Sequence, residues 1–142
     1  MKLRDIMSTP AVRIHPSENV AVAARTMERY NIGAMPVCGS DGRLYGIITD
    51  RDIVTRCIAS GKRVENTKVE EVMTANIIAV RPDLDVSAAA AIMGRKQVRR
   101  LPVMENGKLC GMVSLGDIAL KEDGNLDAAD ALVEISSHLS CG

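Results

Sequence analysis

An internal duplication constrains the fold of this chain more than any other feature. When the sequence is shifted by 66 positions, and by 65 after a turn near Asp41, 14 of 49 aligned positions between Asp5 and Val54 are identical. The identities include prolines, glycines and an aspartate in the same order in both copies, which chance does not produce. Repetition of this kind indicates one supersecondary unit used twice. We therefore expect two copies of one unit within the 142 residues.

Each copy is expected to form the elements β-α-β-β-α after a short leading helix. Pro16 and Pro82 end the extended segments, and Ser17 and Asp83 are the expected caps of the helices that follow. In the first copy we expect a leading helix over 3–7, an extended segment over 12–14, helices over 19–30 and 50–59, and strands over 34–37 and 44–48. In the second copy we expect a leading helix over 69–73, an extended segment over 77–80, helices over 85–96 and 115–120, and a hairpin beginning with a strand over 101–104.

The expected fold class is α+β, with two repeats packed sheet to sheet about a pseudo-two-fold axis and a C-terminal helix. One parallel crossover and one hairpin per repeat predict a three-stranded sheet with helices on one face. About 50 residues cannot bury both faces of such a sheet, so the two copies are expected to cover each other. The expected boundaries are a first repeat over 1–60, a linker over 61–67, a second repeat over 68–121 and a helical tail over 122–142.

The tail is expected to form a helix over 125–139 whose apolar side needs cover from this chain or from a second chain. The residues expected on that side are Leu126, Ala129, Leu132, Val133 and Ile135.

The composition supplies a core but favours neither a nucleic-acid site nor a membrane segment. Apolar residues make up 46% of the chain, although it has no Phe or Trp and only Tyr30 and Tyr45 as aromatic residues. The 18 basic and 18 acidic residues cancel, whereas nucleic-acid-binding proteins usually carry a basic face. No long apolar run indicates a signal peptide or a membrane span. The four cysteines form no C-x-x-C pair, so a cytosolic location with reduced thiols is expected.

The same strand-to-helix junction ends the hairpin in both copies. Thr49 and Asp52 lie three residues apart at the first junction, and Ser114 and Asp117 repeat that spacing at the second. A hydroxyl followed three residues later by a carboxylate is close to a helix capping box. An ionised carboxylate can also accept hydrogen bonds from both hydroxyls of a ribose 2′,3′-diol. The free backbone N–H groups at the start of the helix would favour an anion nearby. Capping and ligand contact are therefore both open interpretations, and the two roles are compatible.

Several short motifs recur in order in both copies, among them residues 32–37 (IGAMPV), residues 46–52 (GIITDRD) and their counterparts in the second copy. Together they resemble the cystathionine β-synthase (CBS) domain family, and stand-alone bacterial CBS pairs in particular. The resemblance covers residues 2–120. It implies a regulatory or sensing module without catalysis. In many members, clefts between the two repeats bind AMP, ATP or S-adenosylmethionine.

The resemblance also implies which residues contact such a ligand. The ribose hydroxyls would meet Asp52 or Asp117, with the hydroxyl of Thr49 or Ser114 nearby. The residues that would line an adenine pocket are Val12, Ala34, Met35 and Pro36. These four are equally what the core of a strand requires.

Arg99 and Arg100 stand where members of the family place side chains that contact phosphate. Guanidinium groups suit phosphate oxygens, and the alternative is two solvated arginines. The first copy has Gly33 and Ala34 at this place, so the two clefts are expected to be unequal.

Other candidate chemistry is sparse. His138 and Cys141 are candidate metal ligands, but two ligands do not make a structural zinc site. Cys38 is a candidate redox thiol at the end of a strand, although inert buried thiols are commoner. His15 is the only other histidine, and no motif places a catalytic arrangement around either one. Neither enzyme activity nor a required cofactor is expected.

Three functions remain open. The first is a CBS pair that binds an adenosine-containing ligand and acts in trans on an unknown protein partner. The second is a dimeric interaction protein whose clefts are vestigial. The third is a metal- or redox-responsive stress protein that acts through its cysteines and tail. A homodimer is expected, because CBS pairs commonly associate through their helices and the apolar tail helix needs cover.

Overall fold

The structure is a computed structural model that describes residues 1–120 and 125–139. It divides into two compact units. The first unit is Ala11–Ile77, and the second unit joins Met1–Pro10 to Ile78–Gly142. The first ten residues therefore belong with the second copy of the repeat. Each unit has its own hairpin and its own hydrophobic core.

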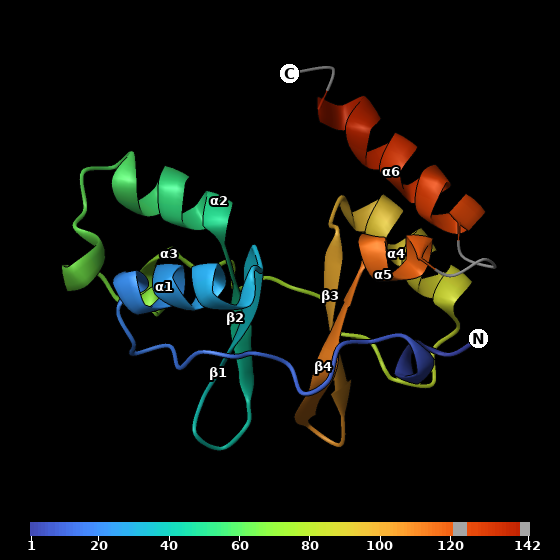
Figure 1. Ribbon diagram of the computed structural model, residues 1–142, viewed down its shortest axis with the longest axis horizontal. Coiled ribbons are helices and arrows are strands. Elements are labelled where there is room, and N and C mark those ends of the chain that lie inside the picture. Colours follow the sequence, from blue (N-terminus) through green and yellow to red (C-terminus); the bar gives the residue numbers. More distant parts are fainter. Residues whose placement is uncertain (121–124, 140–142) are drawn as a thin grey trace. The chain divides into compact units, whose positions relative to one another are not determined.

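In the first unit, helices lie on one side of an antiparallel hairpin (Figure 1). The hairpin consists of β1 (Ala34–Cys38) and β2 (Leu44–Thr49). The helical elements are α1 (Val20–Tyr30), α2 (Asp50–Asp52), its π-helical continuation η2 (Ile53–Ile58), the 3-10 turn η3 (Val64–Asn66) and α3 (Val69–Val72). The fully buried core residues are aliphatic apart from Met35 and Cys57, and they include Val20, Ile48, Val69 and Val72.

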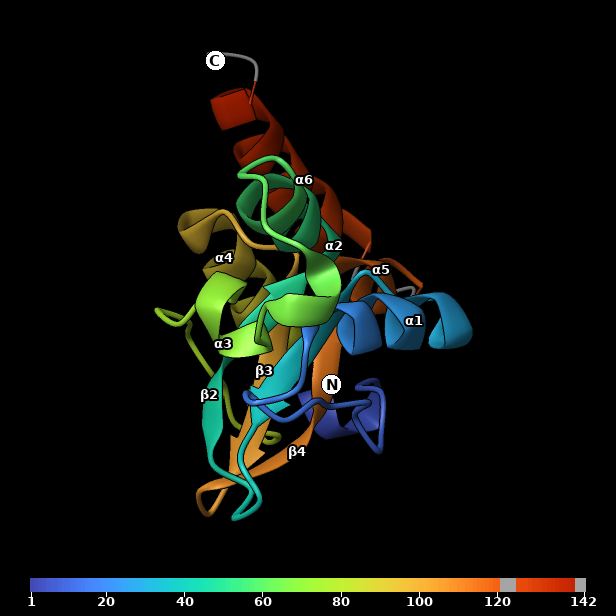
Figure 2. The ribbon, with the colours of Figure 1, turned by 90° about the vertical axis from the view of Figure 1, so that its left-hand side faces the viewer.

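The second unit repeats this arrangement and adds one helix. Its elements are the 3-10 turn η1 (Leu3–Asp5), α4 (Val86–Lys96), β3 (Arg100–Glu105), β4 (Lys108–Ser114), α5 (Leu115–Ala119) and α6 (Asn125–Leu139). Figures 1 and 2 show α6 lying along α4 and α5, and these three helices are in contact. The α+β class, the two repeats and the C-terminal helix are thus confirmed.

The leading segments of the two copies are exchanged between the units. The N–H and C=O groups of Thr74 pair with those of Ile47 in the first unit, at 2.8 and 2.9 Å. In the second unit, Ser8 pairs in the same way with Met112, at 2.8 and 3.2 Å. Leu3, which is fully buried, contributes to the core of the second unit. Each leading segment therefore packs on the hairpin of the other copy.

A glycine permits each of these close pairings. A Cβ atom on Gly46 would lie 2.5 Å from the backbone oxygen of Thr74, and one on Gly111 would lie 2.5 Å from that of Ser8. Such distances are shorter than a van der Waals contact, so a side chain at either position displaces the leading segment. The paired glycines of the two copies thus serve backbone packing.

The expected third strand of each sheet is only a single parallel bridge. Ile14 donates to Pro36 O at 3.1 Å and accepts from Cys38 N at 2.9 Å. Val80 bridges Val103 in the same way in the second unit. The prediction of a longer strand was wrong because a proline follows each of these segments two residues later, and proline cannot donate to a ladder.

The predicted helix caps also need correction. Asn19 caps α1 by accepting the N–H of Val22 at 2.9 Å, whereas Ser17 Oγ lies 2.7 Å from His15 Nδ1. In the second copy, Asp83 forms an ion pair with Arg81 rather than a cap. Sequence could not separate the candidates, because each copy has several polar residues before the helix.

At the start of α4, the residue in the cap position is Asp85, and it makes no side-chain cap hydrogen bond. Its carboxylate instead lies 3.0 Å from Lys2 Nζ. The hydrogen bond from Lys2, together with the charge of Lys2, lowers the pKa of Asp85. The ion pair links the first residues of the chain to α4.

The buried side of α6 matches the predicted one at Ile135 and differs from it at the other predicted side chains that the structure describes. Ala128, Ala131 and Ile135 are buried, whereas Leu132 and Val133 are 43% and 69% exposed. Ala129 is also exposed. Small residues on both helices explain the difference, because a Cβ on Gly94 of α4 would lie 3.4 Å from Ala131 Cα. Close packing of small side chains prevails over burial of the larger aliphatic ones. The side chain of Leu126, also predicted on this side, lies outside the described residues.

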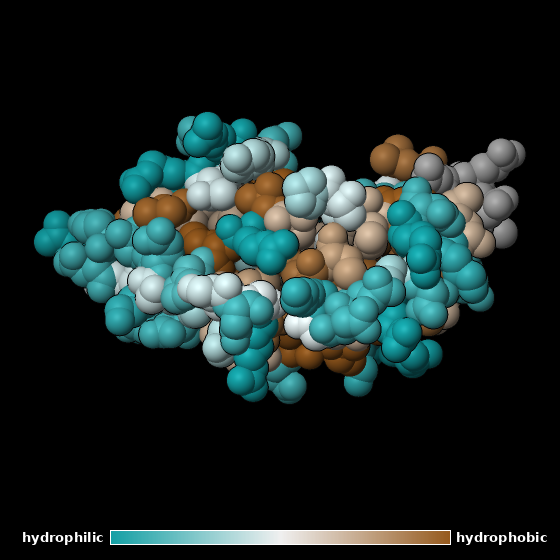
Figure 3. All heavy atoms as spheres, turned by 90° about the horizontal axis from the view of Figure 1, so that it is seen from below, coloured by the Kyte–Doolittle hydropathy of each residue, from teal (hydrophilic) through white to brown (hydrophobic). Residues whose placement is uncertain are grey.

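The surface is mixed in character. Figure 3 shows a face on which hydrophilic residues predominate and hydrophobic ones lie in small groups between them. Among the described residues, no helix has the length and apolar character needed to cross a bilayer.

Candidate functional site

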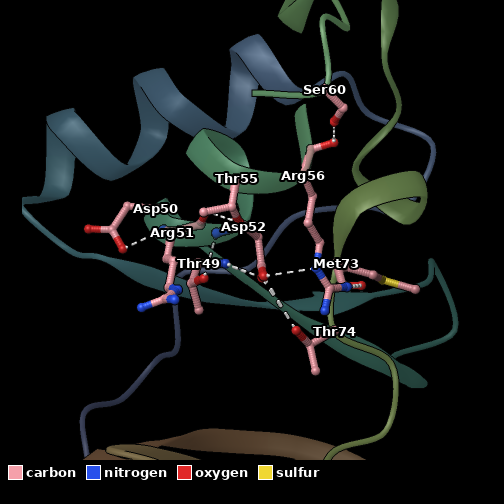
Figure 4. A network of polar contacts seen from close by, with 9 residues as sticks. All are labelled: Thr49, Asp50, Arg51, Asp52, Thr55, Arg56, Ser60, Met73 and Thr74. Atoms are coloured by element: carbon pink, nitrogen blue, oxygen red, sulfur yellow. Dashed lines mark hydrogen bonds and ion pairs between the residues drawn. The ribbon is translucent and has the colours of Figure 1, made fainter. Parts of the chain in front are cut away.

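The junction between β2 and α2 forms a capping box. Thr49 Oγ1 accepts the N–H of Asp52 at 3.0 Å, and Asp52 Oδ2 accepts the N–H of Thr49 at 3.0 Å. Two backbone donors at the start of the helix are satisfied reciprocally in this way. The capping interpretation of the Thr49 and Asp52 spacing is therefore correct (Figure 4).

Asp52 has further partners inside the first unit. Its Oδ1 lies 3.7 Å from Arg56 Nε, and the hydroxyl of Thr74 lies 3.5 Å from both carboxylate oxygens. Arg56 also donates from Nη1 to Met73 O at 3.3 Å, so its side chain is held across this corner (Figure 4). The side chain of Asp52 is only 10% exposed. A ligand at Asp52 would have to displace Thr74 or Arg56.

Asp117 has the same capping geometry but fewer partners. Its Oδ2 accepts the N–H of Ser114 at 2.8 Å, and its own N–H donates to Ser114 Oγ at 3.0 Å. The structure gives its Oδ1 no partner among residues 1–120 and 125–139. Asp117 is half-buried, whereas Asp52 is buried. Within the described part of the chain, the second junction thus leaves one carboxylate oxygen without a partner, which the first does not.

A hollow of about 570 Å³ lies beside the second junction. It brings together three of the residues predicted to contact ligand: Arg99, Arg100 and Ser114. The N–H of Leu115 donates to Arg99 O at 2.8 Å, which fixes the start of β3 against the start of α5. Asp117 does not line the hollow, but it is hydrogen-bonded to Ser114, which does.

Sequence reasoning missed the rest of the lining. The remaining residues are Leu115, Gly116 and Ala119 of α5 and Ala128, Ala129 and Leu132 of α6. The sequence predicted α6 itself, but no local pattern indicated that it faces Arg99 and Arg100. The repeat could not signal this either, because α6 has no counterpart in the first copy.

The predicted adenine-pocket residues lie in the first unit, beside Thr49. Ala34 is the Cα partner of Thr49 in the hairpin, and Met35 and Pro36 follow it along β1. All three are buried, and Met35 is a fully buried member of the core. Val12 is partly buried and packs against the same core. The hydrophobic core already explains much of their apolar character.

The described cysteines are free and differ in exposure. Cys38 and Cys57 are buried, and Cys110 is half-buried. Burial raises the pKa of the Cys38 thiol, which the charge of Arg13 partly opposes, so little of the reactive thiolate is present at neutral pH. Cys141 and the side chain of His138 lie outside the described residues. Within the described part of the chain, no group of three or more potential metal ligands occurs.

Comparison with known proteins decides the family. The sequence model of the CBS domain matches residues 3–58 and again residues 69–123. The chain belongs to the CBS domain family. Pairs of CBS domains are regulatory, and this chain carries one such pair.

Related CBS proteins match over most of this chain. The CBS domain-containing protein YhcV of Bacillus subtilis is 37% identical over 134 residues, which are 94% of each chain. The crystal structure of Hypoxic Response Protein I, with two coordinated zinc ions, has a TM-score of 0.79 at 35% identity. It covers 84% of this chain and 98% of its own. The similarity to stand-alone CBS pairs is thus confirmed.

A third structure is the CBS domain pair of protein MJ0100 in complex with 5′-methylthioadenosine and S-adenosyl-L-methionine. It has a TM-score of 0.77 and 30% identity, and it covers 88% of this chain and 98% of its own. That protein therefore binds adenosyl ligands.

Proposed function

We propose that this chain is a cytosolic regulatory CBS pair that binds an adenosine-containing ligand, either AMP, ATP or S-adenosylmethionine. It carries out no catalysis itself and acts in trans on a protein partner. One observation carries the proposal: a carboxylate with an available oxygen at Asp117 lies next to a hollow lined by two guanidinium groups and Ser114. The adenosyl ligands of the MJ0100 pair support the same ligand class.

The two junctions contribute unequally to this function. Asp52 already contacts Arg56 and Thr74, so ligand binding there requires these contacts to be exchanged. Asp117 has no such competitor among the described residues. The second unit is therefore the proposed primary site, and the first unit binds more weakly or remains empty.

The homodimer remains part of the proposal. Exposed aliphatic side chains occur on helices of both units, namely Val54 and Ile58 in the first and Leu132 and Val133 in the second. Exposed aliphatic side chains on a helix favour association with another apolar surface.

Calorimetric titration of AMP, ATP and S-adenosylmethionine tests the function. We expect at least one of them to bind the wild type with a Kd below the millimolar range. Asp117→Asn should weaken that binding by about tenfold or more, because the amide offers one acceptor oxygen where the carboxylate offers two. The amide oxygen can still accept the N–H of Ser114, so the fold is expected to be retained. Asp117→Asn thus separates a role in binding from a role in capping.

The matched control is Asp50→Asn. Asp50 is exposed at the start of α2, and among the described residues its carboxylate accepts only the N–H of the next residue, Arg51, at 2.8 Å. This variant should bind like the wild type. If none of the three ligands binds the wild type below the millimolar range, the nucleotide function is lost.

One observation favours a second candidate, a ligand-free interaction protein. Both aspartates already complete a helix capping box, and Asp52 is enclosed by protein partners. A structural role alone would account for both residues. The titration above separates the two candidates, because a ligand-free protein gives no heat with any of the three compounds.

A further inference from the structure

Helix α6 contacts α4 and α5 of the second unit and lies outside the residues that match the CBS family (Figure 2). The family match ends at residue 123, whereas α6 spans Asn125–Leu139. Two hollows flank the helix, one of about 570 Å³ on the side of α5 and one of about 230 Å³ on the side of α4. We call the part of α4 and α5 that α6 contacts, together with Arg99 and Arg100, the α6 docking surface.

We propose that the α6 docking surface binds an acidic amphipathic helix of a protein partner, and that α6 is a resident helix which the partner helix displaces. This inference rests on the action in trans proposed above and deepens it, because it names the surface that acts and the kind of partner. It is independent of which adenosine ligand the chain binds.

The α4 side of the docking surface is suited to a closely packed helix. Gly94 of α4 is buried, and a Cβ atom there would lie 3.4 Å from Ala131 Cα and 2.5 Å from Glu134 Oε2. At the equivalent position of α1, 66 residues earlier, the first copy has Glu28, which is exposed. The second copy therefore has a small residue where the first has a charged one, and this lets the backbone of another helix approach closely.

The resident helix fills the docking surface incompletely. Of its described residues, Ala128, Ala131 and Ile135 are buried, and only the last has a side chain larger than a methyl group. The larger side chains of Leu132 and Val133 are 43% and 69% exposed. An isolated helix of about 15 residues is marginal in water, so α6 depends on this limited packing. A helix with bulkier apolar side chains beside the hollows would bury more apolar surface than α6 does.

The charges of the docking surface and of α6 are complementary. The docking surface contributes three guanidinium groups and no carboxylate to the two hollows, and these belong to Arg95, Arg99 and Arg100. Helix α6 contributes three carboxylates and no basic group, and these belong to Asp127, Asp130 and Glu134. Complementary charge speeds association and selects among partners. The same surface therefore selects an acidic helix, bound through its apolar side as helices bind in grooves.

The arginines and the buried side chains have different tasks. All three arginines are exposed, so they attract and select a helix rather than fix its position. The position of α6 is fixed by the side chains that it buries in the core of the second unit, among them Ile135. Because α6 and the partner helix compete for one surface, a change that weakens the docking of α6 strengthens the binding of the partner.

The test titrates the full chain with fluorescently labelled peptides and follows their anisotropy. The probe has the sequence of residues 125–139 with Ala129→Leu, which adds an apolar side chain at an exposed position beside the larger hollow. We expect the probe to bind. A control peptide that also carries Asp127→Lys, Asp130→Lys and Glu134→Lys should bind at least about tenfold more weakly. Added salt should weaken the binding of the acidic probe.

Variants of the full chain show where the probe binds. Ile135→Ala weakens the resident helix and leaves the docking surface unchanged, so the probe should bind this variant about tenfold more tightly than the wild type. Gly94→Glu places the residue of the first copy on the docking surface, and the probe should bind it at least about tenfold more weakly. Circular dichroism checks that the variants are folded. If Gly94→Glu does not fold, the two peptides and Ile135→Ala still decide.

The matched control for Gly94→Glu is Lys96→Gln. It changes the charge of α4 by the same amount at an exposed position that lines neither hollow. The probe should bind this variant within about twofold of the wild type.

A probe that does not bind, or that binds no better than its lysine-substituted control, would overturn the inference. Equal binding to Ile135→Ala and to the wild type would show that α6 is not displaced. A dimer of the chain that Gly94→Glu abolishes would assign the docking surface to α6 of a second copy instead of a partner.

The nucleotide titrations described above are independent of these results. If an adenosine compound binds but the probe does not, this inference fails and the proposed ligand function stands. If the probe binds but no adenosine compound does, the ligand function fails and the docking surface stands.

Discussion

Gly111→Val is expected to destabilise the second unit by about 3 kcal/mol, at the upper end of overpacking effects. A Cβ at this position would lie 2.5 Å from the backbone oxygen of Ser8 and 3.0 Å from Thr9 Cγ2. The backbone of Ser8 is held by two hydrogen bonds to Met112, so the clash costs either those bonds or the position of the leading segment. Urea unfolding followed by circular dichroism measures the change.

Gly116→Ala is the matched control. A Cβ at Gly116 would meet only Ser114 Oγ, at the ordinary contact distance of 3.6 Å. Since Gly116 lies within the helix α5, alanine should be neutral or stabilise by up to about 1 kcal/mol. A Gly111→Val protein with the wild-type unfolding midpoint would contradict the pairing of the leading segment with β4.

The double variant Arg99→Glu, Arg100→Glu is expected to reduce ATP binding by about 100-fold. Hydrogen bonds to charged groups contribute about 1.5–3 kcal/mol each, and reversing both charges replaces attraction of the phosphates by repulsion. Both side chains are exposed, so the fold should tolerate the change. Isothermal titration calorimetry measures the affinity.

Arg95→Glu is the control for this charge reversal. Arg95 is an exposed arginine in the same unit, but it lines the separate hollow between α4 and α6. The Arg95→Glu variant should bind ATP with an affinity within about twofold of that of the wild type. An equal loss in Arg95→Glu would indicate a general charge effect rather than a phosphate site at Arg99 and Arg100.

Local sequence patterns predicted the elements and the capping boxes well. The helix predicted over 19–30 is α1, and the strand predicted over 34–37 is β1, each within one residue at its ends. The spacing of Thr49 and Asp52 also predicted a contact that the structure contains. These features depend on residues near each other in the chain, which a single sequence displays.

Features that depend on distant contacts were not predictable in this way. The exchange of the leading segments depends on Thr74 reaching Ile47 and on Ser8 reaching Met112. No local pattern specifies such pairings. The π-helical hydrogen bonding of η2, in which the N–H of Ala59 donates to Val54 O at 2.8 Å, also has no sequence signature in this chain.

In the candidate site, too, some residues could be predicted from the sequence, whereas a contact between distant segments could not. Ser114 was predicted from the repeated junction, and Arg99 and Arg100 were predicted from the family resemblance. The structure brings all three into one hollow. The wall formed by α6 could not be predicted, because the sequence placed Leu132 on an apolar side that needs cover without showing whether this chain or a second chain covers it. The close packing of Ala131 near Gly94 determines the rotation of the helix.

The most direct test is a crystal structure of the full chain grown with saturating AMP or ATP. We predict density for the nucleotide in the second unit, with its ribose hydroxyls on the Asp117 carboxylate and its phosphate on Arg99 and Arg100. Crystals grown under the same conditions that show no nucleotide against Asp117 or Asp52 would contradict the proposed function.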